Sequence, residues 1–519
     1  MKKILKVLIS RIAIICLLFG VQIAALILLT LKISRTYVFF YSFLEIFSIC
    51  VVLYITSSHT NPSHKLTWVV LILIFPLFGG ILYFMLSVSR ATKGFRKRIN
   101  VSKAETINLL EQDEAIIGRI RRLDTGIAAQ CNYISNMGFP VYKNTQTRYF
   151  DSGEEFFVSL IENIKKAKKF IFIEFFIINK GIMWNTVLSV LEQKVKEGVD
   201  VRIIYDDAGC LNRLPHKYYE KLRSKGIKCC VFNPFSPIPE IRLNHRDHRK
   251  IIVIDGYIAY TGGINLSDEY INVKEKYGHW KDAAVLVKGE AVWSLTAMFL
   301  QLWSFISGQE NGCGRKNNQE DYNKFRTFKS DFCDSDADEF VQPFSDSPVD
   351  DEAVGENIYL NMILRAKKYV YIFTPYLVVD HTMIKALRLA AKSGVDVRIV
   401  TPHIPDKWYV FLVTQSYYPV LLEAGVRIYE YTPGFLHSKA FLCDDELAVV
   451  GTINLDFRSL YFHFECGIFL YKTSSINEIR EDFLKTFPIC QVVTLEDCKK
   501  VNLPRRILQA FLRLFAPLM

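Results

Sequence analysis

The sequence lacks the patterns that would define a disulfide-rich domain or a zinc module. Its twelve cysteines are scattered without paired spacing, and Cys229 and Cys230 are adjacent. Small disulfide-stapled domains and zinc modules both need cysteines at regular pair spacings. These two classes are therefore excluded, and no cluster of metal ligands is visible.

Acidic residues are outnumbered, since 53 Asp and Glu stand against 64 Lys and Arg and give a net charge of +11. Hydrophobic residues make up 50% of the chain, and the mean hydropathy is positive, at +0.15. Such values are unusual for a soluble enzyme and ordinary for a membrane-attached one. The basic excess suits an anionic partner, either a lipid headgroup or a nucleic acid.

Three long apolar stretches open the chain, at residues 12–31, 38–55 and 66–88. Each is near the ~20 residues that span the hydrocarbon core of a bilayer, so we predict a membrane region over residues 1–98 with two or three transmembrane helices. The first stretch follows basic residues as a signal peptide would, but no small-residue cleavage site follows it. Glu45 counts against the second stretch, because a carboxylate is costly in lipid.

A basic cluster follows the third stretch and predicts its orientation. Lys and Arg are enriched in cytoplasmic flanks, so we expect this end, and the chain beyond it, in the cytoplasm of a multi-pass membrane protein. The basic residues before the first stretch favour the same side, which three spans cannot satisfy, and we let the larger cluster decide. It consists of Arg90, Lys93, Arg96, Lys97 and Arg98.

From about residue 99 the composition is that of a soluble α/β protein with an internal repeat. In each copy Ala-Lys-Lys leads into a short apolar run, a helical stretch follows, and Gly-Val-Asp-Val-Arg-Ile opens a second run; the copies begin at Ala167 and Ala366. This alternation indicates βαβ units. We therefore predict an α/β fold of two related lobes, 99–307 and 357–519, each a mostly parallel or mixed sheet flanked by helices. A polar, acidic linker at 308–356 joins them.

Each lobe carries the same short motif near the end of its repeat. A histidine is followed after two residues by a lysine, after five more by an aspartate, and then by a Gly-x-Ile-Asn segment. One copy could arise by chance, but two copies with identical spacing at matching places of a repeat indicate a functional site. The residues are His248, Lys250, Asp255 and Asn265 in the first lobe, and His437, Lys439, Asp444 and Asn454 in the second.

The spacing places the histidine and the lysine of each motif on one face of a strand, because residues i and i+2 point the same way. Imidazole can attack phosphorus or move a proton near neutral pH, and an ammonium beside it offsets phosphate charge. Asp255 and Asp444 have the opposite parity. We expect their carboxylates to hold local structure rather than to attack substrate.

The duplicated motifs resemble the signature of the phospholipase D superfamily, and the chain is similar, more narrowly, to bacterial cardiolipin synthases. The similarity runs from about residue 38 to the C-terminus and includes Glu174-Phe175-Phe176, Thr374-Pro375-Tyr376, Asn454 to Ser459, and Pro517-Leu518. Two places depart from the family pattern. His463 stands where Asn is more usual, and Ser345-Asp346-Ser347-Pro348 replaces Ser-Gly-Pro.

The resemblance implies one catalytic set formed by both motifs: His248, Lys250, Asp255, His437, Lys439 and Asp444. By analogy His248 attacks phosphorus to form a phosphohistidine, and His437 protonates the leaving alkoxide and later deprotonates the acceptor. Asn265 and Asn454 bind phosphoryl oxygens with the lysines. Two downstream acids, Asp282 and Glu465, fix the histidine tautomers. The implied chemistry uses no metal and no cofactor.

The activity implied by the resemblance is that of a cardiolipin synthase, which joins two phosphatidylglycerol molecules in the membrane bilayer and releases glycerol. Two alternatives share the site: a lipid hydrolase that uses water, and a transferase that uses phosphatidylethanolamine or another alcohol. A nuclease is disfavoured, because a nucleic-acid partner does not explain the apolar N-terminus. From Pro504 onward, arginines among apolar residues are typical of a helix on a membrane surface, with a core-packing helix as the alternative.

Overall fold

The computed structural model describes residues 20, 24, 35–58, 61–87, 90–107, 109–234, 245–307, 321–327, 337–350 and 352–519. These residues fall into two compact units. The first contains the residues up to Lys97, His245 and the C-terminal Leu514–Met519, and the second contains Arg98–Pro234 and Arg246–Arg513. Apart from His245 and Leu514–Met519, the described residues of both lobes predicted from the repeat lie in the second unit.

The first unit contains the helices α3 (Arg35–Ser57), α4 (Pro62–Ile74) and α5 (Pro76–Ser87). The span predicted at 38–55 lies within α3, but the span predicted at 66–88 is wrong as a single helix. Pro76 has no N–H to continue α4, and Phe75 before it leaves the helical region with a ψ of 75°. None of the helices that the structure describes is long and apolar enough to cross a membrane. Apart from residues 20 and 24, the span predicted at 12–31 lies outside the described residues.

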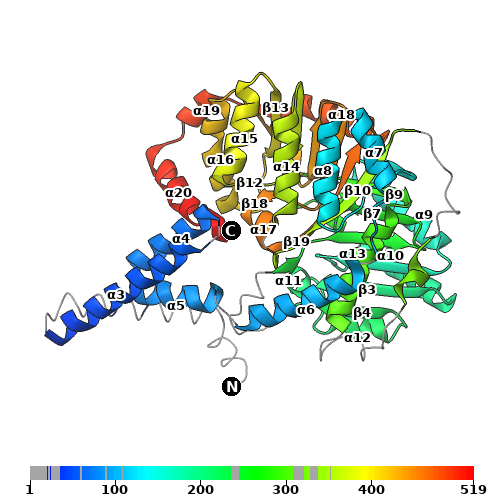
Figure 1. Cartoon of the computed structure of the whole chain (residues 1–519), viewed down its shortest axis with the longest axis horizontal. Helices are drawn as coiled ribbons and strands as arrows, with labels where there is room; N and C mark the ends of the chain where they lie inside the picture. Colours follow the sequence, from blue (N-terminus) through cyan, green and yellow to red (C-terminus); the bar gives the residue numbers. More distant parts are fainter. Residues whose placement is uncertain are drawn as a thin grey trace. The chain divides into compact units, whose positions relative to one another are not determined.

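Helices α4 and α5 fold back on each other and pack against α3 (Figure 1). Gly79 of α5 lies so close to α4 that a Cβ there would be 2.8 Å from the Cα of Ile72. The rings of Trp68 and Tyr83 meet edge to face, with their centroids 5.4 Å apart. A helical hairpin with a small apolar core therefore replaces the predicted third span.

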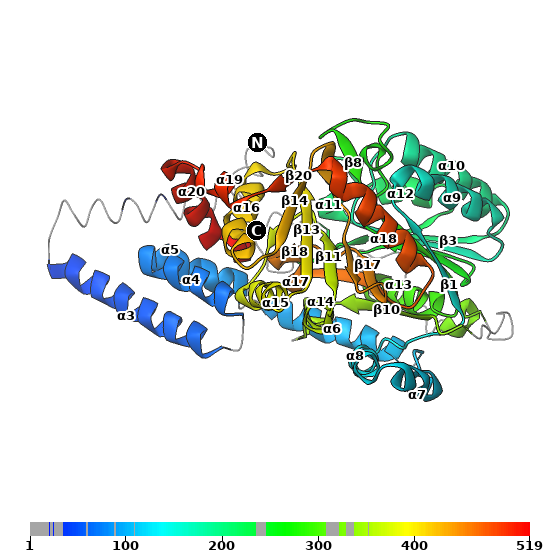
Figure 2. The same cartoon turned by 90° about the horizontal axis from the view of Figure 1, so that it is seen from above.

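The first lobe is a mixed sheet in the order β1-β9-β7-β6-β2-β3-β4. Strands β2, β3 and β4 are parallel, and the remaining neighbours pair antiparallel. Helices α9 (Gly153–Lys166) and α10 (Ile182–Lys196) lie side by side on this lobe (Figure 2). The strands are β1 (Thr145–Phe150), β2 (Phe170–Phe175), β3 (Asp200–Asp206), β4 (Lys228–Phe232), β6 (Lys250–Ile254), β7 (Ile258–Gly262) and β9 (Ala284–Gly289).

The second lobe repeats this plan in the order β10-β19-β17-β16-β11-β13-β14-β20. Along this path β11, β13 and β14 are parallel and the other neighbours pair antiparallel. The α/β prediction is confirmed, but antiparallel pairs outnumber parallel ones. Helices α14 (Val354–Arg365), α15 (His381–Lys392) and α16 (Trp408–Leu422) lie side by side along it (Figure 1). The strands are β10 (Phe340–Asp346), β11 (Tyr369–Phe373), β13 (Asp396–Pro402), β14 (Arg427–Tyr431), β16 (Ala440–Cys443), β17 (Leu447–Gly451), β19 (His463–Tyr471) and β20 (Cys490–Val493).

Two segments inside the predicted linker, 308–356, belong to the lobes, so that prediction is too long. Strand β10 forms one edge of the second sheet, and its sequence mixes Pro343 and polar residues with apolar ones, which hid it. Phe325 of the short helix η3 (Tyr322–Phe325) packs on Phe172 of the first lobe, with ring centroids 5.0 Å apart.

Two short strand pairs join the lobes directly. Strand β5 (Arg246–Asp247) pairs in parallel with β19, and β8 (His279–Lys281) pairs in parallel with β15 (Gly434–Leu436). In each pair, one strand directly precedes a motif histidine, and the other strand contains or directly precedes the acid, Glu465 or Asp282, of the opposite lobe. The remaining helices used below are α6 (Arg90–Ile107), α13 (Val292–Ser307) and α20 (Leu503–Leu514).

Candidate active site

Each motif histidine directly follows one of the two inter-lobe strands. The backbone N–H of His248, after β5, donates to the carbonyl oxygen of Phe464 at 2.9 Å. The backbone N–H of His437, after β15, donates to the carbonyl oxygen of Lys281 at 2.7 Å. The pairing across the lobes thereby brings both histidines into one region.

The first dyad is formed by His248 and Glu465 of the opposite lobe. Nδ1 of His248 lies 2.9 Å from Oε1 and 3.0 Å from Oε2 of this buried carboxylate. Thr452, from the Gly-x-Ile-Asn segment of the second lobe, donates its hydroxyl hydrogen to Oε2. Glu465 therefore orients the imidazole and is itself held in place.

The second dyad reverses the lobes. Nδ1 of His437 lies 2.6 Å from Oδ2 of Asp282, and the N–H of Ala283 donates to Oδ1 at 2.8 Å. A Cβ at Gly263 would lie only 2.0 Å from Oδ1, so glycine makes room for this carboxylate. Trp280 and Tyr270 flank the imidazole, each with its ring centroid 5.5 Å from that of His437.

Both imidazoles are neutral near pH 7. Burial, assisted by the charges of Lys250 and Lys439, holds the pKa of His248 well below its usual value. Burial also lowers the pKa of His437 to about 4. For Asp282 burial opposes ionisation, but the charges of His437 and Lys439 outweigh it and lower the pKa. With each Nδ1 facing a carboxylate, Nε2 is the nitrogen of each ring with a free lone pair.

The two motif lysines are buried beside the histidines. The ammonium of Lys250 donates to the carbonyl oxygen of His248, and that of Lys439 donates to the carbonyl oxygen of His437. Burial lowers the pKa of Lys250 to about 8 and that of Lys439 to about 7. An anion bound between them would favour their charged forms.

Asp255 and Asp444 close matching turns at the far ends of their strands. Each adopts a left-handed backbone with a φ of 55°. The carboxylate of Asp255 accepts the N–H groups of residues 168–170 at 2.7–2.9 Å, and that of Asp444 accepts those of residues 367–369 at 2.7–2.8 Å. Both carboxylates thus bind backbone at the start of β2 or β11, away from the histidines.

The two motif asparagines differ in how many of their side-chain atoms already have hydrogen-bond partners. Asn265 accepts the N–H of Ile177 at 3.0 Å and donates to the hydroxyl of Tyr270 at 2.7 Å. Asn454 donates to Asp456 at 3.4 Å, and its buried Oδ1 has no hydrogen-bond partner. Asn454 therefore has the greater capacity left for a ligand.

The pattern of motifs did not identify two further residues of the site, Thr452 and His463. Thr452 lies in the quoted motif segment, and His463 was visible only as a departure from the family pattern. The ring of His463 lies beside that of His248, with centroids 5.5 Å apart. Within the described residues, one group of side chains could hold a metal ion, namely His248, His463 and Glu465. The sequence did not indicate this cluster, because its members come from both lobes.

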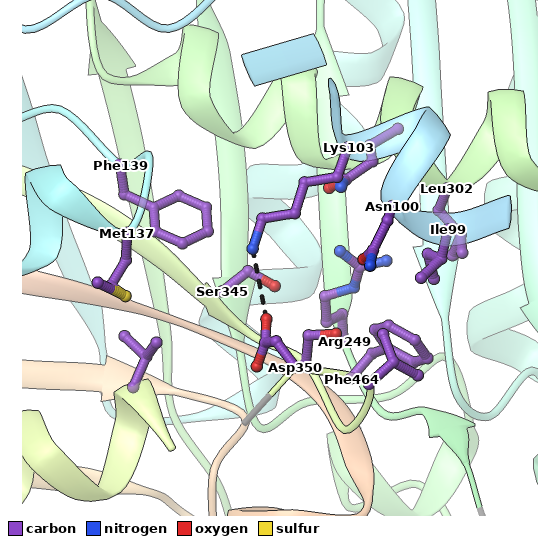
Figure 3. Close-up of a pocket in the computed structure, with 14 residues that line it drawn as sticks. Ile99, Asn100, Lys103, Met137, Phe139, Arg249, Leu302, Ser345, Asp350 and Phe464 are labelled. Atoms are coloured by element: carbon purple, nitrogen blue, oxygen red, sulfur yellow. Dashed lines mark hydrogen bonds and ion pairs between the residues drawn. The ribbon is translucent and has the colours of Figure 1, made fainter. Parts of the chain in front are cut away.

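A separate pocket lies next to the first motif and is not lined by its histidine (Figure 3). Arg249 and Phe464 line it, although their neighbours His248 and Glu465 do not. An ion pair between Lys103 of α6 and Asp350 crosses it at 3.3 Å. The pocket therefore abuts the backbone that carries the site rather than the histidines themselves.

Two lobes of the same plan, each supplying one histidine, one lysine and the acid for the opposite histidine, define a phospholipase D-like protein. A solved structure agrees on the fold. The phosphatidylserine synthase of Haemophilus influenzae Rd KW20 superposes with a TM-score of 0.54 at 16% identity, covering 72% of this chain and 93% of that one.

Sequence comparisons define the family. The model of the family described as "Cardiolipin synthase, PLD-like domain" matches residues 160–303 and 359–487, and one described as "Phospholipase_D-nuclease N-terminal" matches 44–87. A Streptococcus mutans protein is 42% identical over 90% of this chain and 99% of its own. A cardiolipin synthase of a Geobacillus species is 34% identical over 90% and 91%. The chain belongs to the cardiolipin synthase family, and the predicted enzyme class, a phosphatidyltransferase of the phospholipase D superfamily, is confirmed.

Proposed function

We propose that the protein makes cardiolipin and glycerol from two phosphatidylglycerol molecules through a phosphohistidine. The observation that carries the proposal is the pair of dyads, in which each neutral imidazole offers Nε2 beside two buried lysines. One ring can then act as nucleophile and the other as acid and base.

In the first step Nε2 of His248 attacks the phosphorus of one phosphatidylglycerol. The bond from phosphorus to the glycerol headgroup oxygen breaks, and His437 gives its proton to that oxygen. His437 must therefore be protonated when substrate is bound, and the negative phosphodiester favours this by raising its pKa. The carboxylate of Asp282 also stabilises the imidazolium.

In the second step a hydroxyl of another phosphatidylglycerol attacks phosphorus and passes its proton to His437. The bond from phosphorus to Nε2 of His248 breaks, which releases cardiolipin and restores the enzyme. Lys250, Lys439 and Asn454 bind the phosphoryl oxygens, while Asn265 keeps Tyr270 and the loop after β2 in place. Asp255 and Asp444 support the strands that carry the motifs.

Transfer rather than hydrolysis requires that a lipid hydroxyl reaches the intermediate before water does. Attachment to the cell membrane keeps lipid hydroxyls close to the intermediate. We place the N-terminal segments in the bilayer as a multi-pass region, with the lobes in the cytoplasm. The exposed apolar side chains of α3 support membrane contact, as do those of α20. They include Phe39, Phe43 and Leu53 on α3, and Leu503, Ile507 and Phe511 on α20.

The test uses the full-length protein in vesicles of phosphatidylglycerol alone, with lipid products identified by mass spectrometry. We expect cardiolipin and glycerol, little phosphatidic acid, and reversal of the reaction by excess glycerol. His248→Ala and His437→Ala remove synthesis, while His216→Ala, at an exposed histidine of the first lobe, keeps it. Phosphatidic acid as the main product would replace this proposal with a hydrolase. A requirement for added phosphatidylethanolamine would identify a different acceptor.

A further inference from the structure

His463 is a buried histidine with no hydrogen bond to either ring nitrogen. Its side chain is 8% exposed, neither Nδ1 nor Nε2 has a hydrogen-bond partner, and the carboxylate of Glu465 lies beyond hydrogen-bond distance at 3.7 Å from Nδ1. Buried polar groups are nearly always hydrogen-bonded, because leaving one unpaired costs about 1–3 kcal/mol. The proposed reaction gives His463 no task, so its position beside His248 calls for another explanation.

The neighbours of His463 supply the rest of a ligand set. Oε1 of Glu465 lies 3.7 Å from Nδ1 of His463 and 2.9 Å from Nδ1 of His248. One ligand atom from each of the three residues falls within 4.8 Å of the others. Ligand atoms of tetrahedral Zn²⁺ at about 2.0–2.1 Å from the ion are about 3.3 Å apart, so side-chain shifts of about 1 Å complete the geometry.

We infer that His248, His463 and Glu465 form an inhibitory site for a divalent transition metal, of which Zn²⁺ fits best. Two imidazoles and one carboxylate are a usual zinc donor set, and a fourth position stays open for water. The inference goes beyond the proposed function and depends on it only for the role of His248. It assigns the metal no part in transfer.

Inhibition follows from which nitrogen the metal takes. In the dyad Nδ1 of His248 carries the proton that faces Glu465, and Nε2 has the free lone pair. When the ring proton moves from Nδ1 to Nε2, Nδ1 gains a lone pair with which it binds the metal, and no proton leaves the ring. Nε2 then has no lone pair for phosphorus, and Glu465 is withdrawn to the metal. The nucleophile is blocked as long as the ion stays.

The charges around the site limit its affinity. Only one carboxylate is present, and the ammonium groups of Lys250 and Lys439 lie close enough to affect the pKa of His248. Both repel a dication. Binding should therefore be weaker than in a structural zinc site, and the ion should leave in the presence of a chelator. The other dyad has Trp280 at the position of His463, so it offers no such set.

Binding is tested on the full-length protein in detergent with Co²⁺, whose visible absorption reports tetrahedral nitrogen and oxygen ligation. We expect one Co²⁺ per chain, displaced by Zn²⁺. In His463→Asn and His463→Gln the affinity should fall by about tenfold or more, while His216→Asn keeps it. Thermal unfolding confirms that each variant is folded. A visible spectrum and affinity unchanged in both folded His463 variants, or no tetrahedral spectrum in the wild type, would overturn the site.

Inhibition is tested separately, with Zn²⁺ titrated into the phosphatidylglycerol assay and each variant compared with its own metal-free rate. We expect wild-type inhibition that a chelator reverses, and an inhibition constant raised about tenfold or more in His463→Asn. Equal inhibition of both proteins would overturn the inference. Co²⁺ bound through His463 in a protein that makes no cardiolipin would refute the proposed function while leaving the site intact.

Discussion

The two dyads share their topology and differ in their surroundings. Each joins a histidine of one lobe to an acid of the other, and in each a ring lies two residues before the acid. That ring is His463 beside His248 and Trp280 beside His437, both with centroids 5.5 Å from the motif imidazole. The comparison teaches that a duplicated fold can place two equivalent histidine–acid pairs while the neighbouring side chains give each pair different surroundings.

The backbone under the two motifs differs as well. In the first lobe Arg249 lies buried between Glu174, at 2.8 Å, and Asp247, at 3.1 Å. The corresponding positions of the second lobe are Ser438, Phe373 and Leu436. The first motif is thus supported by a buried ionic cluster of these three residues, and the second has uncharged side chains at the same three positions.

The largest expected effect separates the roles of the two histidines. His248→Ala should lower the rate by about 10⁴-fold or more, because no nucleophile remains, and His437→Ala by about 10²–10⁴-fold. Phosphatidyl-p-nitrophenol needs no acid for its leaving group, so it should give a burst of nitrophenol with His437→Ala and none with His248→Ala. The burst is measured by absorbance in stopped flow. The opposite pattern would exchange the two roles.

The second effect concerns stability and contrasts the supports of the motifs. Arg249→Met leaves Glu174 and Asp247 buried without their cation and should destabilise the fold by about 3–5 kcal/mol. Ser438→Ala, the matched change in the second lobe, should cost about 1 kcal/mol or less. Thermal unfolding in detergent compares them. Similar losses of stability in both variants would mean that the ionic cluster stabilises the fold no more than the uncharged side chains of the second lobe do.

The third effect concerns the acid of the first dyad. Thr452→Val keeps the shape but removes the hydroxyl that holds Glu465, which should cost about 1.5–3 kcal/mol of transition-state stabilisation. Because Thr452 positions Glu465 rather than touching substrate, kcat should fall and KM should stay. The control is Thr401→Val, which removes a buried hydroxyl paired with Tyr418 elsewhere in the same lobe. An equal fall of kcat in the control would point to a general loss of packing.

The fourth effect concerns pH and is small for each pH unit. Burial raises the pKa of Asp346 in the second lobe to about 8, and Gly355 donates to it at 2.8 Å. Because this pKa is raised on folding, its stabilising contribution is complete below about pH 4 and is lost as pH rises toward 8, by about 1.4 kcal/mol per unit. Asp346→Asn should flatten the fall of the melting temperature between pH 5 and 8. Asp151→Asn, at an acid directly after β1 of the first lobe, should leave that slope unchanged.

The sequence predicted the parts of the site better than their connections. Periodicity and repetition identified the two lobes and placed β2, β3 and β6, because buried strands carry dense apolar runs. The pairing of each histidine with the acid of the other lobe did not follow, since strands as short as β5 and β8 have no readable pattern. The break at Pro76 was missed because the sequence stays apolar across it. Strand β10 was missed because polar residues interrupt its apolar pattern.

Because each lobe supplies the acid for the histidine of the other, the two copies also depend on each other within one gene. A gene for one lobe alone would encode a histidine without its carboxylate and a carboxylate without its histidine. Asp282 pairs with His437, 155 positions downstream, and Glu465 pairs with His248, 217 positions upstream. Each acid therefore pairs with a histidine of the other repeat. A substitution at either acid therefore acts first on the histidine of the opposite lobe.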